Sequence, residues 1–310
     1  MGKTKVAVLF GGISAEHEVS IRSADYIIKN LDLERFEVIR VKISKKGDFD
    51  LDKIAQADII FPILHGVGGE DGSIQGFCQT IGKPFIGSDI EASALALDKV
   101  VCKQIWQNLK LPIPSFQFFD KKQWQEKHLT IMQRIEPPVF VKPANTGSSI
   151  GISRVNKKSE LQKAIEQALI YGDKIIVEKA LENIREIEVA ILGNEKLIIS
   201  IPGEIIPAEE FYSYDAKYKL DSKLIIPAIL AKEKIKEIQH LAKKAYNALG
   251  CRGMARVDFF LEKPEGKVYL NEINTIPGFT KISMFPKLME ISGIKYKNLL
   301  TKLIELGLEK

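Results

Sequence analysis

The chain has 310 residues, 45% of them hydrophobic, which is enough for roughly two or three domains with buried cores. Its 45 basic and 40 acidic residues are dispersed, so the net charge of +5 predicts no nucleic-acid-binding stripe. No run approaches the ~18 apolar residues of a membrane span, and the opening strand is too short for a signal-peptide core. Cys78, Cys102 and Cys251 are far apart and odd in number, so we expect a cytoplasmic protein without disulfides.

Strand and helix signals alternate over residues 1–95, which we take as a first domain. Apolar, β-branched runs predict strands, and helical periodicity predicts helices. In chain order we expect a strand at 6–10, a helix at 18–31, strands at 36–43 and 58–64, a helix at 73–81 and a strand at 84–86. This order predicts a doubly wound parallel sheet. Gly11 and Gly12 follow the first strand, but the Gly-x-Gly-x-x-Gly fingerprint is absent, so a nicotinamide site is not expected.

Residues 96–180 and 181–310 are predicted to form a second and a third domain of mixed α+β type. For the second we expect a helix at 97–108, strands at 115–119 and 139–142, a helix at 158–171 and a strand at 174–178. For the third we expect strands at 186–192 and 196–201, a helix at 232–249, a hairpin within 255–274 and a helix from 297. A polar, tyrosine-rich loop lies near 209–221.

The hairpin carries the most informative polar residues. A strand has period two, so Arg256 and Asp258 share a face, as do Glu272 and Asn274. We expect a register that places Arg256 opposite Glu272, which brings all four groups together. Three oxygen donors beside an arginine suit a hard cation such as Mg²⁺ with a phosphorylated ligand. A solvated face with an ordinary salt bridge is the alternative.

Two further segments indicate phosphate binding. The loop at 145–151 is rich in small residues, which free backbone N–H groups to surround a phosphate, although an ordinary hairpin turn has the same composition. Lys142 precedes this loop at a strand end, and Lys99 follows an apolar helix start; either lysine alone is also compatible with a solvated charge. In the turn after Asn274, Gly278 allows the backbone to approach a ligand closely.

Arg-x-Asp followed by Asn-Glu-x-Asn-Thr-x-Pro-Gly resembles the metal-binding end of the ATP-grasp fold, and within it the D-alanine–D-alanine ligase family. Further segments carry the same resemblance in the same order: 9–20, 65–72, 93–99, 141–151, 177–179 and 211–218. The resemblance implies an ATP-grasp fold behind the N-terminal doubly wound sheet. It also implies ATP and two Mg²⁺ or Mn²⁺ ions, two D-alanine molecules and a homodimer.

Roles for nucleotide and metal binding follow from the same resemblance. The implied metal ligands are Asp258, Glu272 and Asn274, with Glu272 bridging the two ions. The residues that match the family's nucleotide contacts are Lys99, Lys142, Ser149, Glu178, Lys179, Leu181 and Glu186. The lysines at 99 and 142 would contact phosphates, the backbone at 178–181 the adenine edge, and Glu186 the ribose. Because the segment 182–188 is one residue longer than the common pattern, Glu188 is an alternative to Glu186.

The implied reaction has two steps, phosphorylation of one D-alanine carboxylate by ATP and attack of a second D-alanine amine on the acyl phosphate. The residues that match catalytic or substrate-binding groups are Glu16, His65, Ser148, Lys217, Tyr218, Arg256, Gly278 and Ser283. Arg256 and the Gly278 N–H would stabilise the oxyanion, and His65 would lie near the transferred phosphoryl group. Glu16 would hold the first ammonium, and Ser283 would receive the second carboxylate.

The 209–221 loop is expected to be a lid, because an acyl phosphate must be shielded from water. In it, Lys217 would point inward to the second carboxylate, and Tyr218 with Ser148 would join Glu16 to the loop. Family members that prefer D-lactate carry a histidine where this chain has Tyr218, so the dipeptide is the expected product. The alternatives are a ligase for D-lactate or D-serine, a nucleotide-binding protein with an inactive ATP-grasp fold, or another carboxylate–amine ligase.

Overall fold

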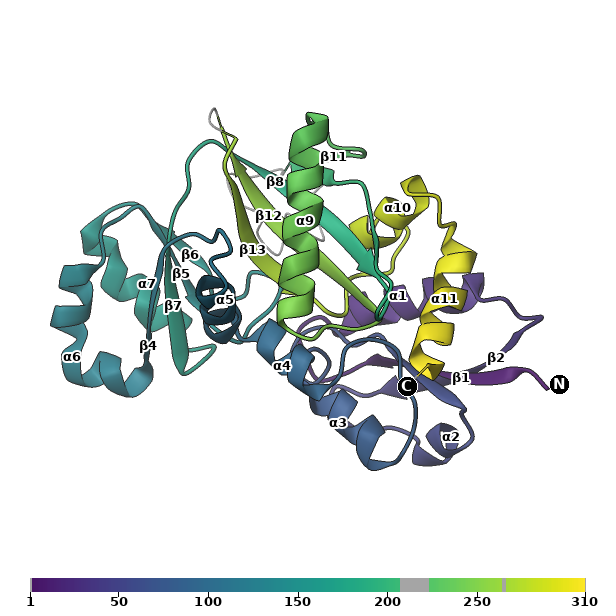
Figure 1. Cartoon of the computed structure of the whole chain (residues 1–310). Coiled ribbons are helices and arrows are strands. Elements are labelled where there is room, and N and C mark those ends of the chain that lie inside the picture. Colours follow the sequence, from purple (N-terminus) through teal and green to yellow (C-terminus); the bar gives the residue numbers. More distant parts are fainter. Residues whose placement is uncertain (1, 207–222, 264–265, 310) are drawn as a thin grey trace.

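The computed structural model describes residues 2–206, 223–263 and 266–309 (Figure 1). The predicted lid at 209–221, with Lys217 and Tyr218, lies outside them. The described helices are α1 (His17–Asn30), α2 (Leu51–Ala55), α3 (Ser73–Thr80), α4 (Ile90–Leu97), α5 (Lys99–Asn108), α6 (Lys121–Arg134), α7 (Leu161–Ala168), α9 (Lys232–Ala248), α10 (Met284–Ile291) and α11 (Tyr296–Leu308). Within these ranges, no helix has the length and apolar character needed to span a membrane.

The N-terminal sheet is parallel and has the order β2-β1-β3, from β1 (Thr4–Gly11), β2 (Phe36–Ile43) and β3 (Ile59–Pro62). Helices α2 and α3 pack on one face, and α1 and α11 pack on the other. Both faces of β1 are therefore covered, which is why residues 6–10 read as one continuous apolar run. The predicted strand at 84–86 is reduced to a single bridge between Ile60 and Phe85.

The second sheet is antiparallel and has the order β4-β7-β5-β6. Its strands are β4 (Phe116–Asp120), β5 (Val139–Pro143), β6 (Ser153–Val155) and β7 (Lys174–Lys179). Helix α6 was not predicted because it is mostly polar and buries only Trp124. A capping box between Asp120 and Gln123 begins it, and this was the available sequence signal. The predicted helix at 158–171 is a short 3₁₀ turn (Lys158–Glu160) followed by α7.

The third sheet is antiparallel and follows the order β11-β10-β8-β12-β13, with β9 beside β8. Its strands are β8 (Ile184–Leu192), β9 (Ile198–Ile199), β10 (Gly203–Ile206), β11 (Lys223–Ile225), β12 (Met254–Glu262) and β13 (Val268–Asn274). The strand predicted at 196–201 is thus only two residues long. Helix α9 lies across one face of this sheet (Figure 1), where Val189, Val257 and Ile273 are buried against it.

Alternate residues of β8 and β12 face away from α9, and this second face changes character along the strands. At one end Ala190, Leu192 and Met254 are buried in an apolar cluster. At the other end the same face carries Glu188 and Arg256, which are buried but charged. The apolar end of this face is therefore part of the core, and the charged end is a candidate functional site.

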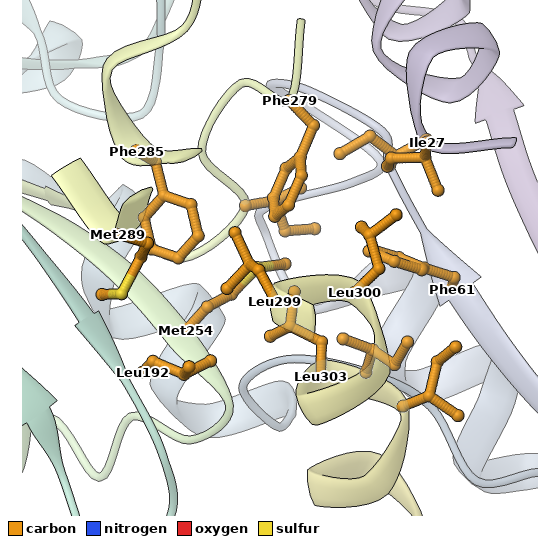
Figure 2. Close-up of a cluster of buried hydrophobic side chains, with 14 of the residues drawn as sticks. Ile27, Phe61, Leu192, Met254, Phe279, Phe285, Met289, Leu299, Leu300 and Leu303 are labelled. Carbon is orange, nitrogen blue, oxygen red and sulfur yellow. The ribbon is translucent and has the colours of Figure 1, made fainter. Parts of the chain in front are cut away.

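The apolar end of this face joins the third sheet to the N-terminal sheet. Leu192 and Met254 of the third sheet, Phe61 of β3 and Leu303 of α11 belong to one buried cluster (Figure 2). Phe279, from the turn after β13, packs edge-on against Phe61 at a centroid distance of 5.9 Å. This cluster fixes the turn after β13 against the N-terminal sheet.

The predicted helix at 97–108 divides at Asp98. Asp98 has an extended backbone (ψ 96°), so α4 ends before it and α5 begins after it. Its carboxylate accepts hydrogen bonds from the N–H groups of Val100 and Val101 at 3.1 and 3.2 Å, which caps α5. This break places Lys99 at the first position of a new helix.

The predicted hairpin register was wrong. Leu261 pairs with Val268, one residue further along than predicted, and a β-bulge then shifts the pairing by one residue more. Arg256 lies opposite Asn274 and Asp258 lies opposite Glu272, and the register then shifts so that Phe259 pairs with Leu270. Asn271 is the extra residue of this bulge. It allows Glu272 to face the polar side while Leu270, two residues earlier, lies in the apolar core. The prediction that Arg256, Asp258, Glu272 and Asn274 lie on one face is confirmed, although the cross-strand partners differ from those predicted.

We predict that the α11 contact stabilises the whole N-terminal region. Leu303→Ala removes a fully buried side chain and should lower the free energy of unfolding by about 3 kcal/mol. Leu308→Ala on the same helix, where the side chain is 44% exposed, is the matched control and should cost under ~0.5 kcal/mol. Urea denaturation measures both, and equal effects would contradict this account of the packing.

Candidate active site

Acidic side chains form a row across the third sheet. Glu188 on β8 lies directly opposite Asp258 on β12, and Asp258 lies directly opposite Glu272 on β13. Arg256 balances part of this charge: Nε and Nη2 donate to the two Asp258 carboxylate oxygens at 2.7 and 2.6 Å, and Nε lies 2.9 Å from a Glu188 oxygen. Like charges opposed across strands repel, so the row favours a further cation.

Arg256 is held in its charged form. Burial opposes the charge, but the neighbouring carboxylates of Asp258 and Glu188 outweigh it and raise the pKa of Arg256 well above its ordinary value. The guanidinium is therefore a fixed positive charge beside the acidic row. In this position it can neutralise an anion that develops near β12.

The predicted metal ligands fit a hard divalent cation. Asp258, Glu272 and Asn274 share the polar face, and the Asn274 amide already donates to Asp258 Oδ2 at 3.0 Å. The set contains only two carboxylates, and the described residues hold no metal-binding group of three from His, Cys, Asp and Glu. Mg²⁺ characteristically binds through few protein oxygens and completes its coordination with water and substrate phosphates. The donor chemistry therefore matches a cation that arrives with a nucleotide.

A cavity of about 530 Å³ opens in front of the acidic row. It lies between the second and third sheets, and residues from both line it, including Phe140, Phe260, Asp258 and Glu272. The predicted nucleotide contacts among its lining residues are Lys99, Lys142, Ser149, Leu181 and Glu186. A volume of this size accommodates a nucleotide.

Lys99 and the 145–151 loop, which were predicted to bind phosphate, both line this cavity. The Lys99 ammonium donates to the Thr146 carbonyl oxygen at 2.6 Å. Burial lowers the pKa of Lys99, while the charge of Glu272 acts in the opposite direction. Ser148 and Ser149 both have left-handed backbones, with φ of 50° and 59°. Such conformations are costly for serine and are typical of binding loops that are held in place by their surroundings.

Lys142 and Glu178 belong to a buried ion triad with a lysine that the sequence did not single out. Lys142 Nζ contacts one carboxylate oxygen of Glu178, and Lys103 Nζ lies 2.8 Å from the other. Burial disfavours the Glu178 carboxylate, but the two ammonium groups outweigh this and lower its pKa to about 2. Lys103 lies one helical turn after Lys99, and that spacing was the sequence signal available for it.

The structure separates the two glutamates that were candidates for the ribose. Glu188 is paired with Arg256 and lies opposite Asp258, within the acidic row. Glu186 lies two residues away along β8, opposite Phe260, and lines the same cavity. A ligand in this cavity can therefore reach Glu186 without breaking the Arg256 pair, which favours Glu186.

A second, smaller cavity of about 30 Å³ adjoins the first. Lys99, Ser148 and Glu272 line both cavities. Ser148 donates a hydrogen bond to the buried carboxylate of Glu16, and a Cβ on Gly147 would lie 3.3 Å from that carboxylate. The 145–151 loop thus touches the loop after β1, as the resemblance implied for Glu16 and Ser148.

The remaining predicted catalytic residues of the described chain lie in or against the turn after β13. His65 is buried, with Nδ1 3.1 Å from the Ile276 carbonyl oxygen in the turn after β13. In the same turn Ser283 Oγ accepts from the Thr280 N–H at 3.0 Å, and a Cβ on Gly278 would lie 2.8 Å from that oxygen. Only glycine fits at 278 without movement of Ser283.

Two of the predicted nucleotide contacts line neither cavity. Glu178 is buried in the ion triad and Lys179 is exposed, whereas Leu181 lines the larger cavity. Sequence reasoning gave no role to Glu70, which lines the smaller cavity and accepts from the Gly66 N–H at 2.7 Å. It also gave none to Ser14, whose hydroxyl donates to the His65 carbonyl oxygen at 2.7 Å.

We predict that Glu178 stabilises the fold in a pH-dependent way. Its folded-state pKa is about 2 against an ordinary 4.5, so the stabilisation is complete above about pH 5 and is lost as pH falls through 2. Glu178→Gln should therefore lower the free energy of unfolding by about 3 kcal/mol at pH 7 and by less at pH 3. Urea titrations of both proteins at the two pH values measure this, and an equal difference at both would contradict it.

Comparison with known proteins places the chain in a family. The model of the D-ala D-ala ligase C-terminus matches residues 105–305, and that of the N-terminus matches 5–57 and 49–88. The D-alanine–D-alanine ligase of Caldicellulosiruptor bescii is 46% identical over 100% of this chain and 96% of its own length. D-alanine–D-alanine ligase B of Clostridium tetani is 42% identical over 99% of this chain and 94% of its own length.

Two solved structures match this chain over almost its full length. The VanG D-Ala:D-Ser ligase from Enterococcus faecalis has a TM-score of 0.89 and 34% identity, covering 99% of this chain and 100% of that one. The D-alanine–D-alanine ligase from Coxiella burnetii has a TM-score of 0.88 and 32% identity, covering 100% and 95%.

The alignments are longer than this chain. The match to the Caldicellulosiruptor bescii protein runs over 352 positions, whereas this chain has 310 residues. The two matches of the N-terminal family model overlap at residues 49–57, between β2 and β3. The fold is the ATP-grasp fold with an N-terminal parallel sheet, and the chain belongs to the D-alanine–D-alanine ligase family.

Proposed function

We propose that this enzyme joins two D-alanine molecules into D-alanyl-D-alanine with ATP, as a step of peptidoglycan precursor synthesis. One observation carries the proposal: the acidic row of Glu188, Asp258 and Glu272 faces a nucleotide-sized cavity whose other wall holds Lys99 and Lys142. Cationic groups opposite a site for a cation are what a bound polyphosphate requires. The family membership supplies the substrate.

The chain's own residues would bind the nucleotide from both sheets. Lys99 and Lys142 would contact phosphate oxygens, with the 145–151 loop beside them. The backbone near 178–181 would meet the adenine edge, with Leu181 in the cavity wall. Glu186 would accept from the ribose hydroxyls, because Glu188 is engaged with Arg256.

Asp258, Glu272 and Asn274 would hold two divalent cations, with Glu272 between them. When bound, Mg²⁺ or Mn²⁺ supplies charge neutralisation at the β- and γ-phosphates. Arg256 already forms two hydrogen bonds with Asp258, so it offsets part of the negative charge at the position where the cations would bind. A cation that binds Asp258 would compete with this ion pair, leaving Arg256 with Glu188 as its acidic partner.

The amino acids would bind where the two cavities adjoin, because a space of about 30 Å³ is too small to hold them by itself. Glu16 would bind the ammonium group of the first D-alanine, with Ser148 keeping its carboxylate in place. Arg256 and the Gly278 N–H would stabilise the carbonyl oxygen during formation and attack of the D-alanyl phosphate. Ser283 would receive the carboxylate of the second D-alanine, with Lys217 from the lid segment, and His65 would lie near the transferred phosphoryl group.

D-Serine is the second candidate for the attacking amino acid. The observation that favours it is the TM-score of 0.89 with the VanG D-Ala:D-Ser ligase from Enterococcus faecalis. The C. bescii and C. tetani relatives, at 46% and 42% identity, carry the D-alanine–D-alanine name. We also propose a cytoplasmic homodimer without nucleic-acid or membrane partners. Cys78, Cys102 and Cys251 are buried and form no disulfide among the described residues, which suits a reducing compartment.

We predict that Glu272 is the least replaceable metal ligand. Glu272→Gln removes the charge between the two cations and should lower kcat by ~10²-fold or more at saturating Mg²⁺. Glu262→Gln, at the far end of the same hairpin, is the matched control and should stay near the wild-type rate. Steady-state release of ADP measures both. Near wild-type turnover of Glu272→Gln would refute the metal assignment.

We predict the dipeptide as the dominant product at pH 7. D-Alanine, D-serine and D-lactate are offered together at equal concentration with ATP and Mg²⁺, and products are resolved by mass. Tyr218 stays neutral at this pH and does not repel the incoming ammonium group as a protonated histidine would. D-Alanyl-D-alanine should predominate. Predominance of the D-serine dipeptide or the D-lactate depsipeptide would overturn the choice of second substrate, while the ATP-dependent activation would stand.

A further inference from the structure

Lys103 has no place in the proposed reaction, yet it is one of the most deeply buried charged residues. Its side chain is 1% exposed, and its ammonium group lies 2.8 Å from a Glu178 oxygen. Lys103 does not line the nucleotide cavity, whereas Lys142, on the other oxygen of the same carboxylate, does. Glu178 is also 1% exposed, so the carboxylate lies behind the cavity wall, between the two lysines.

Packing alone does not explain a lysine at this position. Replacing buried ionic groups with apolar residues of similar volume is often neutral or stabilising, since it removes the cost of desolvating charge. The neighbouring positions of α5 are apolar and buried, with Val100, Cys102 and Trp106 in contact with the surrounding sheets. A methionine at position 103 would continue that apolar pattern. The positive charge of Lys103 therefore needs an electrostatic explanation.

The consequence lies in the balance of charge at the cavity wall. Two ammonium groups share one carboxylate, so the triad carries a net charge of +1, and only Lys142 presents it to the cavity. Glu178 is fully ionised, since its pKa is lowered to about 2. Without Lys103 the carboxylate would belong to Lys142 alone. The pair would then be neutral, and its attraction for a polyphosphate would fall.

We propose that Lys103 is a positioning residue for the nucleotide: by taking one oxygen of Glu178 it keeps a net positive charge on Lys142 toward the phosphates of ATP. The inference rests on the proposed nucleotide site. Lys103 touches neither nucleotide nor substrate, and it acts only through Glu178. It also extends the role of α5, whose first residue, Lys99, faces the same cavity.

The test compares variants that change the charge of the triad. Lys103→Met makes the triad neutral, and the double variant Lys103→Met/Glu178→Gln restores +1 on Lys142 while keeping the backbone. Binding of Mg-ADP is measured by titration calorimetry, with adenosine as a ligand that lacks phosphate. We expect Lys103→Met to lower the affinity for Mg-ADP by roughly tenfold and to change the affinity for adenosine little. The double variant should bind Mg-ADP with an affinity within about threefold of wild type.

Lys174→Met is the matched control for the anchoring of α5. Lys174 contacts Asp98, the cap of that helix, at 2.6 Å, so its removal loosens the same helix without changing the triad. ADP affinity should stay near wild type in this variant. Thermal melts identify folded proteins, and Lys103→Gln serves if Lys103→Met does not fold. If neither single variant folds, the double variant decides, because its ADP affinity should match wild type.

Three results would overturn the inference. They are unchanged ADP affinity in Lys103→Met, equal loss of ADP and adenosine, and a double variant that is as weak as or weaker than the single one. Each would mean that Lys103 fills space or shapes the pocket. Failure of the proposed function is distinguishable, because the wild-type protein would then not bind Mg-ADP at all.

Discussion

Repulsion among acidic side chains is the constraint on which this structure depends. Glu188, Asp258 and Glu272 lie directly opposite one another on adjacent strands, where like charges destabilise a sheet. Arg256 offsets part of the repulsion within the fold, and the cations that accompany a nucleotide would offset the rest. The bulge at Asn271 is what allows this, because it turns Glu272 to the polar face while Leu270 remains in the core. Binding of the proposed cations would therefore relieve repulsion that the fold itself leaves in place.

The same sheet face links this chemistry to the rest of the molecule. Its apolar end, with Leu192 and Met254, packs with α11 and the N-terminal sheet. This contact fixes the turn that holds Gly278 and Ser283, and the Ser148–Glu16 hydrogen bond connects the 145–151 loop to the loop after β1. The residues proposed to bind nucleotide, metal and amino acids thus come from the regions of all three sheets and lie in or near two adjoining cavities.

The sequence predicted which residue types share a face more successfully than it predicted their partners. Strand periodicity placed Arg256, Asp258 and Glu272 on one side, but the pairing depends on a bulge that leaves no clear mark in the residues around Asn271. Lys103 was missed because its spacing of one helical turn from Lys99 assigns it no role, and its partner Glu178 lies 75 residues further along the chain. Long-range electrostatics of this kind become visible only when the fold brings the charges together.

The central claim is that these charges activate the carboxylate of D-alanine with ATP. The most direct measurement is phosphate release from ATP and Mg²⁺ with D-alanine, L-alanine or D-lactate, each offered alone and in pairs, with wild-type protein. The account predicts rapid release with D-alanine, one D-alanyl-D-alanine formed per phosphate, and no comparable release with L-alanine alone. Phosphate release that is indifferent to the chirality of alanine, or absent with D-alanine, would contradict it.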